Sequence, residues 1–159
     1  MMDLLETLLA HNKGTTKRLI EQSAPLTGAQ LDQDFDLGLR TVRLTLDHII
    51  ESMEWWTDLM TGQPRRSFDA LPTDPLSLEG LQLRLERVTQ ELDQKAHDVQ
   101  VHQSWDEHWP AREDQGQTSS YRATLTHVFT HGAHHRSQVI HMLKRLGVKD
   151  VIWGDALGY

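Results

Sequence analysis

The chain has 159 residues and no cysteine, and its net charge is −7 because 23 Asp and Glu residues outnumber 16 Lys and Arg residues. This length predicts a single domain over residues 1–159, which can bury enough surface to need no cross-links. The lack of cysteine excludes disulfides, thiolate zinc sites and a cysteine nucleophile, and the negative charge argues against nucleic acid as a partner, since that binding needs clustered basic residues.

No apolar run approaches the ~18 residues of a membrane span, so we expect no membrane partner. Acidic Asp3 and Glu6 stand where a signal peptide would carry basic residues. We therefore expect a cytoplasmic protein.

Two helices are predicted in the first part of the chain. Leucine and isoleucine recur at helical spacing over 2–23, and Pro25 follows as a stop signal. Residues 24–40 are predicted to form a connection with a short helical turn. A second apolar stripe covers 41–61, and Gly62 is expected to end that helix.

The middle of the chain predicts a loop, a helix and an insertion. Three prolines make 62–76 a loop, and apolar spacing predicts a third helix over 77–97. The weak alternation of Val99 and Val101 favours a short irregular or hairpin insertion over 98–120.

A fourth helix is predicted over 120–146, with Gly147 at its C-cap and basic residues in its last turn. The tail, 148–159, holds apolar residues and is expected to pack back on the helices. Four amphipathic helices in a chain of this size predict an all-α fold, a four-helix bundle with the insertion before its last helix.

Histidine is the unusual residue type, since the chain has ten and five of them lie in the last predicted helix. His127, His131 and His135 follow one another at intervals of four, so neighbouring imidazoles lie on successive turns and can bind one metal ion. With His127 at zero and ~100° per residue, the apolar residues fill an arc from about 60° to about 220°. His131 and His135 fall at about 40° and about 80°, at the border of this arc. His134 and His141 lie on the opposite side of His127 and should be more exposed.

A third ligand should come from a facing helix, because two histidines on one helix rarely complete a site. His48 lies on the second predicted helix in line with Trp55 and Leu59, beside the apolar stripe, so it should point inward or half inward. Taken alone, a histidine such as His48 is more often a core residue with a hydrogen-bond partner than a metal ligand. The acidic face of this helix lies elsewhere: Asp47, Glu51, Glu54 and Asp58. The other histidines are predicted to be surface or loop residues: His11, His97, His102 and His108.

Motifs of several enzyme classes are absent. The sequence has no glycine-rich dinucleotide motif, no Walker loop and no Gly-x-Ser-x-Gly elbow. The zinc-protease motif His-Glu-x-x-His is also absent, because Gly132, Ala133 and His134 separate His131 from His135.

The run His127-Val-Phe-Thr-His131-Gly-Ala-His134-His135-Arg136-Ser-Gln138 resembles the last-helix motif of the DinB (DinB/YfiT-like) family of metal-dependent enzymes. The run Leu46-Asp47-His48-Ile49, followed by the pair Trp55-Trp56, resembles a second element of that family. The resemblance covers nearly the whole chain. It implies an up-up-down-down order of the four helices, a homodimer, and a divalent metal ion, zinc or nickel in many members. It also implies that His48, His131 and His135 hold this ion.

Related proteins use a low-molecular-weight thiol, as mycothiol-dependent isomerases and as bacillithiol or glutathione S-transferases. The resemblance therefore implies a bacillithiol-type S-transferase with a small-molecule substrate, in which the metal lowers the pKa of the thiol. Two alternatives stay open: a hydrolase that uses metal-activated water, and a non-catalytic metal-binding dimer of the stress response.

Four further residues are candidates for a pocket beside the metal or for support of its ligands: His127, Trp55, Trp56 and Arg136. Arg136 falls at about 180° on the helical wheel, inside the apolar arc. It is expected either to form a structural ion pair or to bind the carboxylates of a thiol cosubstrate.

Overall fold

The computed structural model describes residues 3–111 and 118–155. In these residues the structure has five helices and no strand, which confirms the predicted all-α class. Four helices are long, namely α1 (Leu4–Ser23), α3 (Val42–Thr61), α4 (Leu78–His102) and α5 (Tyr121–Arg145). The short α2 (Gly28–Leu31) is the helical turn predicted within 24–40. Among the described residues, no helix combines the length and apolar character needed to cross a membrane.

Polar side chains begin the long helices close to the predicted positions. Asp3, Thr41, Ser77 and Ser120 each accept a hydrogen bond from a backbone N–H of the first turn, which would otherwise lack a partner. Gly62 ends α3 with φ 68°, a left-handed conformation that glycine adopts without steric cost.

The predicted end of the third long helix is wrong. α4 continues to His102, five residues beyond position 97, and Gln103 ends it in a left-handed conformation. Val99 is buried because it continues the apolar stripe of α4, whereas Val101 is exposed. Their apparent alternation is therefore part of a helical pattern, and the insertion is shorter than predicted.

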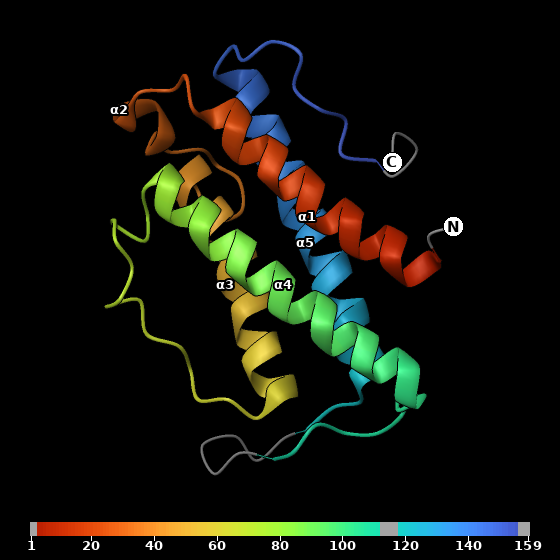
Figure 1. Cartoon of the computed structure of the whole chain (residues 1–159). Helices are drawn as coiled ribbons and strands as arrows, with labels where there is room; N and C mark the ends of the chain where they lie inside the picture. Colours follow the sequence, from red (N-terminus) through yellow and green to blue (C-terminus); the bar gives the residue numbers. More distant parts are fainter. Residues whose placement is uncertain (1–2, 112–117, 156–159) are drawn as a thin grey trace.

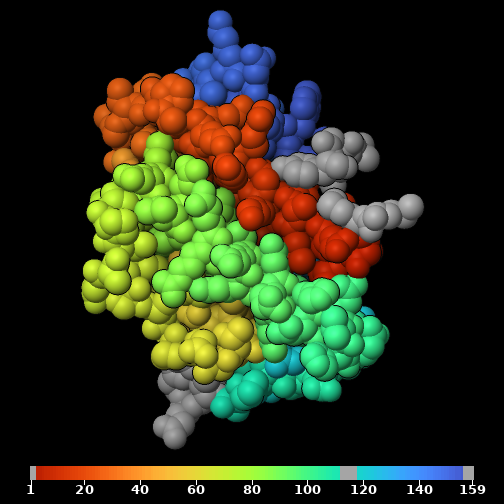
Figure 2. All heavy atoms as spheres, viewed as in Figure 1, coloured from red at the N-terminus to blue at the C-terminus, as the bar shows by residue number. Residues whose placement is uncertain are grey.

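The four long helices pack in a closed arrangement, because α3 and α1 each contact both α4 and α5. Figure 2 shows α1 and α4 side by side on one face of the molecule, with the segment 62–77 along the edge of α4. Buried apolar side chains from all four helices fill the space between them.

The predicted up-up-down-down order of the helices is wrong. Figure 1 shows α1 and α5 running in one direction and α3 and α4 in the other, which gives the order up, down, down, up. The physical reason is the path of 62–77, which runs back along the length of the helices and starts α4 at the same end as α3. The other two connections between long helices reverse the chain direction.

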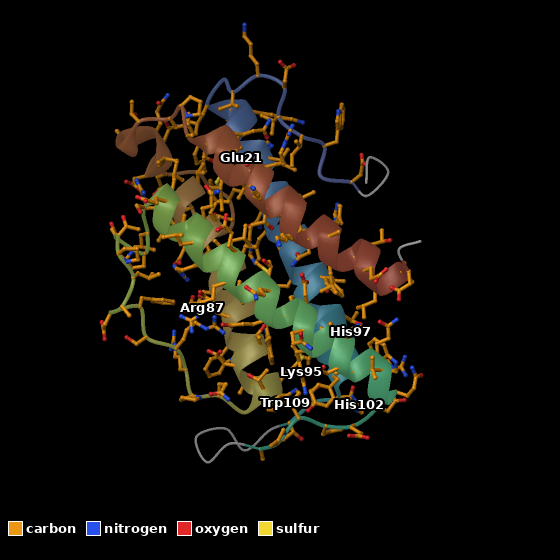
Figure 3. All side chains as sticks on the ribbon, in the orientation of Figure 1. Glu21, Arg87, Lys95, His97, His102 and Trp109 are labelled. Carbon is orange, nitrogen blue, oxygen red and sulfur yellow. The ribbon has the colours of Figure 1, made fainter. Side chains whose placement is uncertain are left out.

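The described part of the insertion is an ordered turn around one antiparallel bridge. His108 pairs with Ser120 in this bridge, and residues 112–117 between them lie outside the described residues. Trp109, labelled in Figure 3, is buried and donates from Nε1 to Thr124 Oγ1 at 3.0 Å. This tryptophan anchors the insertion to the first turn of α5.

The tail packs back in part. Val151 is buried, and Ile152 donates from its backbone to the side chain of Gln22 in α1 at 3.3 Å. Trp153, in contrast, is 85% exposed, and residues 156–159 lie outside the described part. The tail also covers His11, whose Nε2 lies 3.2 Å from the carbonyl oxygen of Gly154, so the prediction of a surface position for His11 is wrong.

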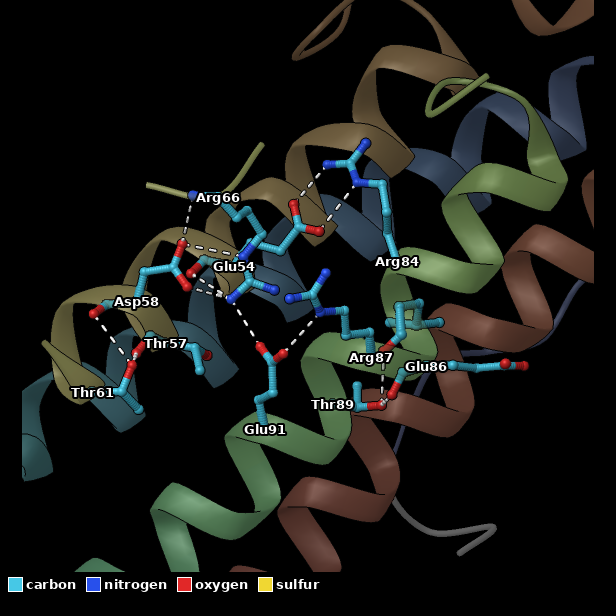
Figure 4. A network of polar contacts seen from close by, with 11 residues as sticks. Glu54, Thr57, Asp58, Thr61, Arg66, Arg84, Glu86, Arg87, Thr89 and Glu91 are labelled. Atoms are coloured by element: carbon cyan, nitrogen blue, oxygen red, sulfur yellow. Dashed lines mark hydrogen bonds and ion pairs between the residues drawn. The ribbon is translucent and has the colours of Figure 1, made fainter. Parts of the chain in front are cut away.

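The acidic face of α3 is partly buried, because α4 packs against it. Glu54 and Asp58 are buried. Arg84 of α4 donates to both carboxylate oxygens of Glu54, at 3.1 and 2.7 Å (Figure 4). It also donates to Asp47 at 2.6 Å. Burial lowers the pKa of the Arg84 guanidinium, but the hydrogen bond to Glu54 and the acidic charges raise it more, so the pKa lies above its usual value and Arg84 stays charged.

A second ion pair joins the segment 62–77 to both neighbouring helices. Arg66 is nine-tenths buried and binds Asp58 of α3 and, at 2.9 Å, Glu91 of α4 (Figure 4). One arginine thus neutralises carboxylates on two helices and holds the returning segment against them.

Replacing Arg84 with Met should lower the free energy of unfolding by about 3–5 kcal/mol, because it leaves the buried carboxylate of Glu54 without its partner. Urea unfolding followed by circular dichroism measures this loss. The control is Arg87→Met, which removes an exposed pair with Glu91 on the same helix and should cost under about 1 kcal/mol. Equal losses in the two variants would contradict the prediction.

Candidate metal centre

Three histidines from two helices meet at one point between α3 and α5. His48 Nε2 and His131 Nε2 lie 3.1 Å apart, and the ring centre of His135 lies 4.7 Å from that of His48 and 4.4 Å from that of His131. The ring nitrogens that converge lie within 4.8 Å of one another. His135 is buried, whereas His48 and His131 are half-buried.

This geometry comes from helical spacing and from the antiparallel packing of α3 on α5. His131 and His135 are four residues apart and lie on successive turns of α5. His48 lies in the second turn of α3, which the cap at Thr41 begins. Next to His48, the neighbouring Ile49 is fully packed in the core, so the backbone at this turn has little freedom.

The three side chains suit a divalent transition metal. Two nitrogens that each lie about 2.0–2.1 Å from one ion are at most about 4.2 Å apart, so the 3.1 Å pair already fits and a small rotation of the third ring completes the set. Neutral imidazoles suit zinc, nickel, copper and iron, whereas magnesium and calcium prefer oxygen ligands. Among residues 3–111 and 118–155, these three histidines are the only group of three or more His, Asp or Glu side chains whose ligand atoms lie this close together.

Two of the three histidines, His131 and His135, have lowered pKa values, which favour the neutral form that a metal requires. Burial, and then the charges of the neighbouring histidines, lower the pKa of His131 from its ordinary value of 6.5 to about 4. Burial also lowers the pKa of His135, although its hydrogen bond with Gln138 opposes this effect. Both imidazoles therefore offer a lone pair at neutral pH.

A cleft of about 410 Å³ opens beside two of the three histidines, His48 and His131. Trp55 and Trp56 of α3 line it, together with His127 of α5. The ring centres of His127 and Trp56 lie 5.1 Å apart. Two tryptophans and three histidines thus line the cleft, and two of these histidines belong to the converging three.

Arg65 is a lining residue that the sequence analysis missed. It extends from the segment 62–77, its guanidinium lies 5.8 Å from the ring centre of Trp55, and it binds Glu51 at 2.7 Å. A loop residue has no periodic signal that places it beside a helix, so only the position of Trp55 on the neighbouring helix hinted at a partner.

Arg136 does not line this cleft. It is buried, and its Nη1 donates to Asn12 Oδ1 of α1 at 2.5 Å, against the helix face left open by Gly132. The structure thus places Arg136 at the contact between α1 and α5. His134 and His141 are exposed, as predicted from the helical wheel.

The comparison with protein families gives one result. The model of the DinB family matches residues 1–158. A comparison with curated proteins found no match. Because the family match spans essentially the whole sequence, the chain belongs to the DinB family.

Proposed function

We propose that this chain is a metal-dependent enzyme whose single domain, a four-helix bundle, binds one divalent ion through His48, His131 and His135. Zinc and nickel are the proposed metals. The observation that carries this proposal is the convergence of the three histidines from α3 and α5, with two Nε2 atoms 3.1 Å apart. Three protein ligands leave a coordination position for a substrate or water, as in catalytic sites.

The proposed reaction is the transfer of a low-molecular-weight thiol to a small electrophilic molecule. A bound divalent ion would supply Lewis acidity that lowers the pKa of a coordinated thiol. The chain has no thiol of its own, so the nucleophile must come from outside. Trp55 and Trp56 would pack against the organic substrate, and Arg65 would bind a carboxylate of the thiol at the mouth of the cleft. We further propose that the protein acts in the cytoplasm as a homodimer.

The histidine variants His131→Ala and His135→Ala should each reduce bound zinc or nickel from one ion per chain to almost none. Removing one of three ligands leaves too few donors for a stable site. Metal analysis and calorimetric titration of protein purified without a histidine tag measure this effect. The far-ultraviolet circular dichroism should stay nearly unchanged, because other side chains form the core.

The matched controls are His141→Ala and His97→Ala, which remove exposed histidines of α5 and α4. Both should keep the ion. Metal loss that is equal in the controls and in the ligand variants would rule out a site at the three histidines.

Metal binding should resist mild acid. The pKa of His131 is lowered to about 4 and that of His135 is also lowered, so protons compete weakly with the metal at these two ligands near neutral pH. Metal content after dialysis should therefore fall mainly as the pH drops toward 4. The metal-free protein should lose stability over part of this range. An unfolded histidine takes up a proton near its ordinary pKa of 6.5 while the folded His131 does not, so the unfolded state gains as the pH falls from 6.5 toward 4. Urea unfolding at several pH values measures this loss of stability. A metal content already halved at pH 6.5 would contradict the prediction that the metal is retained in mild acid.

Metal-loaded protein should consume a thiol in the presence of an electrophile such as chlorodinitrobenzene. The test uses bacillithiol, glutathione, mycothiol and cysteine in turn, and follows free thiol and the conjugate. His131→Ala should abolish the reaction along with the metal, and His141→Ala should not. Hydrolysis of an ester or amide without thiol consumption would instead establish the metal-activated-water alternative. Metal binding with neither reaction would favour the non-catalytic one.

A further inference from the structure

Gln138 of α5 contacts His135, one of the three converging histidines, and the exposed His134. Its Oε1 lies 2.8 Å from His135 Nδ1, and its Nε2 lies 3.1 Å from His134 Nε2. A carbonyl oxygen only accepts hydrogen bonds, so the proton of the neutral His135 ring must be on Nδ1. The lone pair is then on His135 Nε2, the other ring nitrogen.

We propose that Gln138 is a positioning residue that fixes the tautomer and orientation of His135, so that Nε2 faces the metal position. This inference rests on the metal binding proposed above. A histidine that binds a metal through one nitrogen usually donates its other N–H to an oxygen, which fixes the ring and raises its basicity. The Gln138 amide is placed to perform this role for the buried member of the three histidines.

The contact with His134 supports the same orientation of the amide. The amide nitrogen is the donating end of Gln138, and His134 Nε2 is available as an acceptor in the neutral ring. A reversed amide would aim an N–H at His135 Nδ1 and move the ring proton to Nε2. That tautomer has no lone pair on the nitrogen that a metal needs.

The backbone at Gly38, in the α2–α3 connection, lies close to the Gln138 amide. A Cβ atom at position 38 would lie 2.3 Å from Gln138 Oε1 and 2.6 Å from its Cδ. Gly38 also has φ 53°, a conformation that favours glycine. Glycine therefore lets this turn approach the amide more closely than any other residue would.

The turn that carries Gly38 is itself anchored. Arg40 donates from its backbone to the carbonyl of Leu37 at 2.9 Å, and Phe35 donates to the carbonyl of Arg40 at 2.7 Å. Phe35 is almost completely buried in the core. The position of Gly38, and with it the space left for Gln138, is therefore set by core packing.

The first test compares two substitutions at position 138. Gln138→Met keeps the length of the side chain but removes the acceptor, and it should weaken zinc binding by about 10–100-fold. Gln138→Glu keeps an acceptor oxygen and should bind zinc about as tightly as the unchanged protein. Both variants should keep the helicity and thermal stability of the metal-free protein, so a merely structural role would not separate them. Equal zinc affinity in Gln138→Met and the unchanged protein would overturn the proposal.

The second test uses glycine. Gly38→Ala should push the amide away from His135 and weaken zinc binding in the same direction as Gln138→Met. Gly62→Ala is the matched control, because Gly62 also has a positive φ, 68°, but nothing lies within 4 Å of its Cβ position. Both variants bear a similar backbone strain, and only Gly38→Ala touches Gln138. Equal zinc affinity in the two glycine variants would count against the proposed role of this contact.

The third test needs no metal. Nitrogen-15 chemical shifts of the metal-free protein at pH 7.5 report which ring nitrogen of His135 carries the proton. We expect Nδ1–H in the unchanged protein and in Gln138→Glu, and loss of this preference in Gln138→Met. If the unchanged protein binds no ion, the proposed function fails while this measurement still decides the role of Gln138. A His135 ring with its proton on Nε2 would refute that role.

Discussion

The contact between α3 and α5 is the interaction on which the other features of the structure depend. Buried apolar side chains of both helices form the largest part of the shared core, among them Leu46, Ile49, Met53, Val128 and Val139. Because the helices are antiparallel and closely packed, this contact determines which turn of α3 faces which turn of α5. A shift of one residue rotates a helical side chain by ~100°. The apolar register therefore also decides whether His48 meets the two histidines of α5.

On the side of α3 that faces α4, buried ion pairs also hold the helix in place. A buried carboxylate without its partner is far more costly than an exposed one, so Glu54 and Asp58 tolerate only those arrangements in which Arg84 and Arg66 reach them. Apolar contacts on one side and paired charges on the other thus act on the same helix. The apolar contacts would permit several similar packings of α3. The buried ion pairs disfavour every packing that separates an arginine from its carboxylate.

The sequence predicted helix positions well, because caps, stop signals and apolar spacing are local. The path of 62–77 is not local: its prolines indicate a loop but not the direction in which the loop runs, so the sequence had no signal to correct the helix order that the resemblance implied. The helical wheel predicted that His131 and His135 lie at the border of the core, since the angle between two residues depends on one helix alone. The burial of Glu54 was not predicted, because a stripe of charged residues on a helix is usually exposed. The sequence signal for its burial is Arg84, which lies among the leucines of α4 and pairs with Glu54. Arg65 was missed because contacts made by loops depend on the whole fold.

The segment 62–77 has a consequence beyond the return of the chain. Two consecutive arginines of this segment have different surroundings. Arg66 forms ion pairs with α3 and α4, whereas Arg65 lines the cleft beside His48 and His131. The histidines, in contrast, all belong to helices that the core holds rigidly. Loops tolerate insertion and substitution better than the helices they connect. Substitutions at Arg65 can therefore change the lining of this cleft while the three histidines keep their positions on α3 and α5.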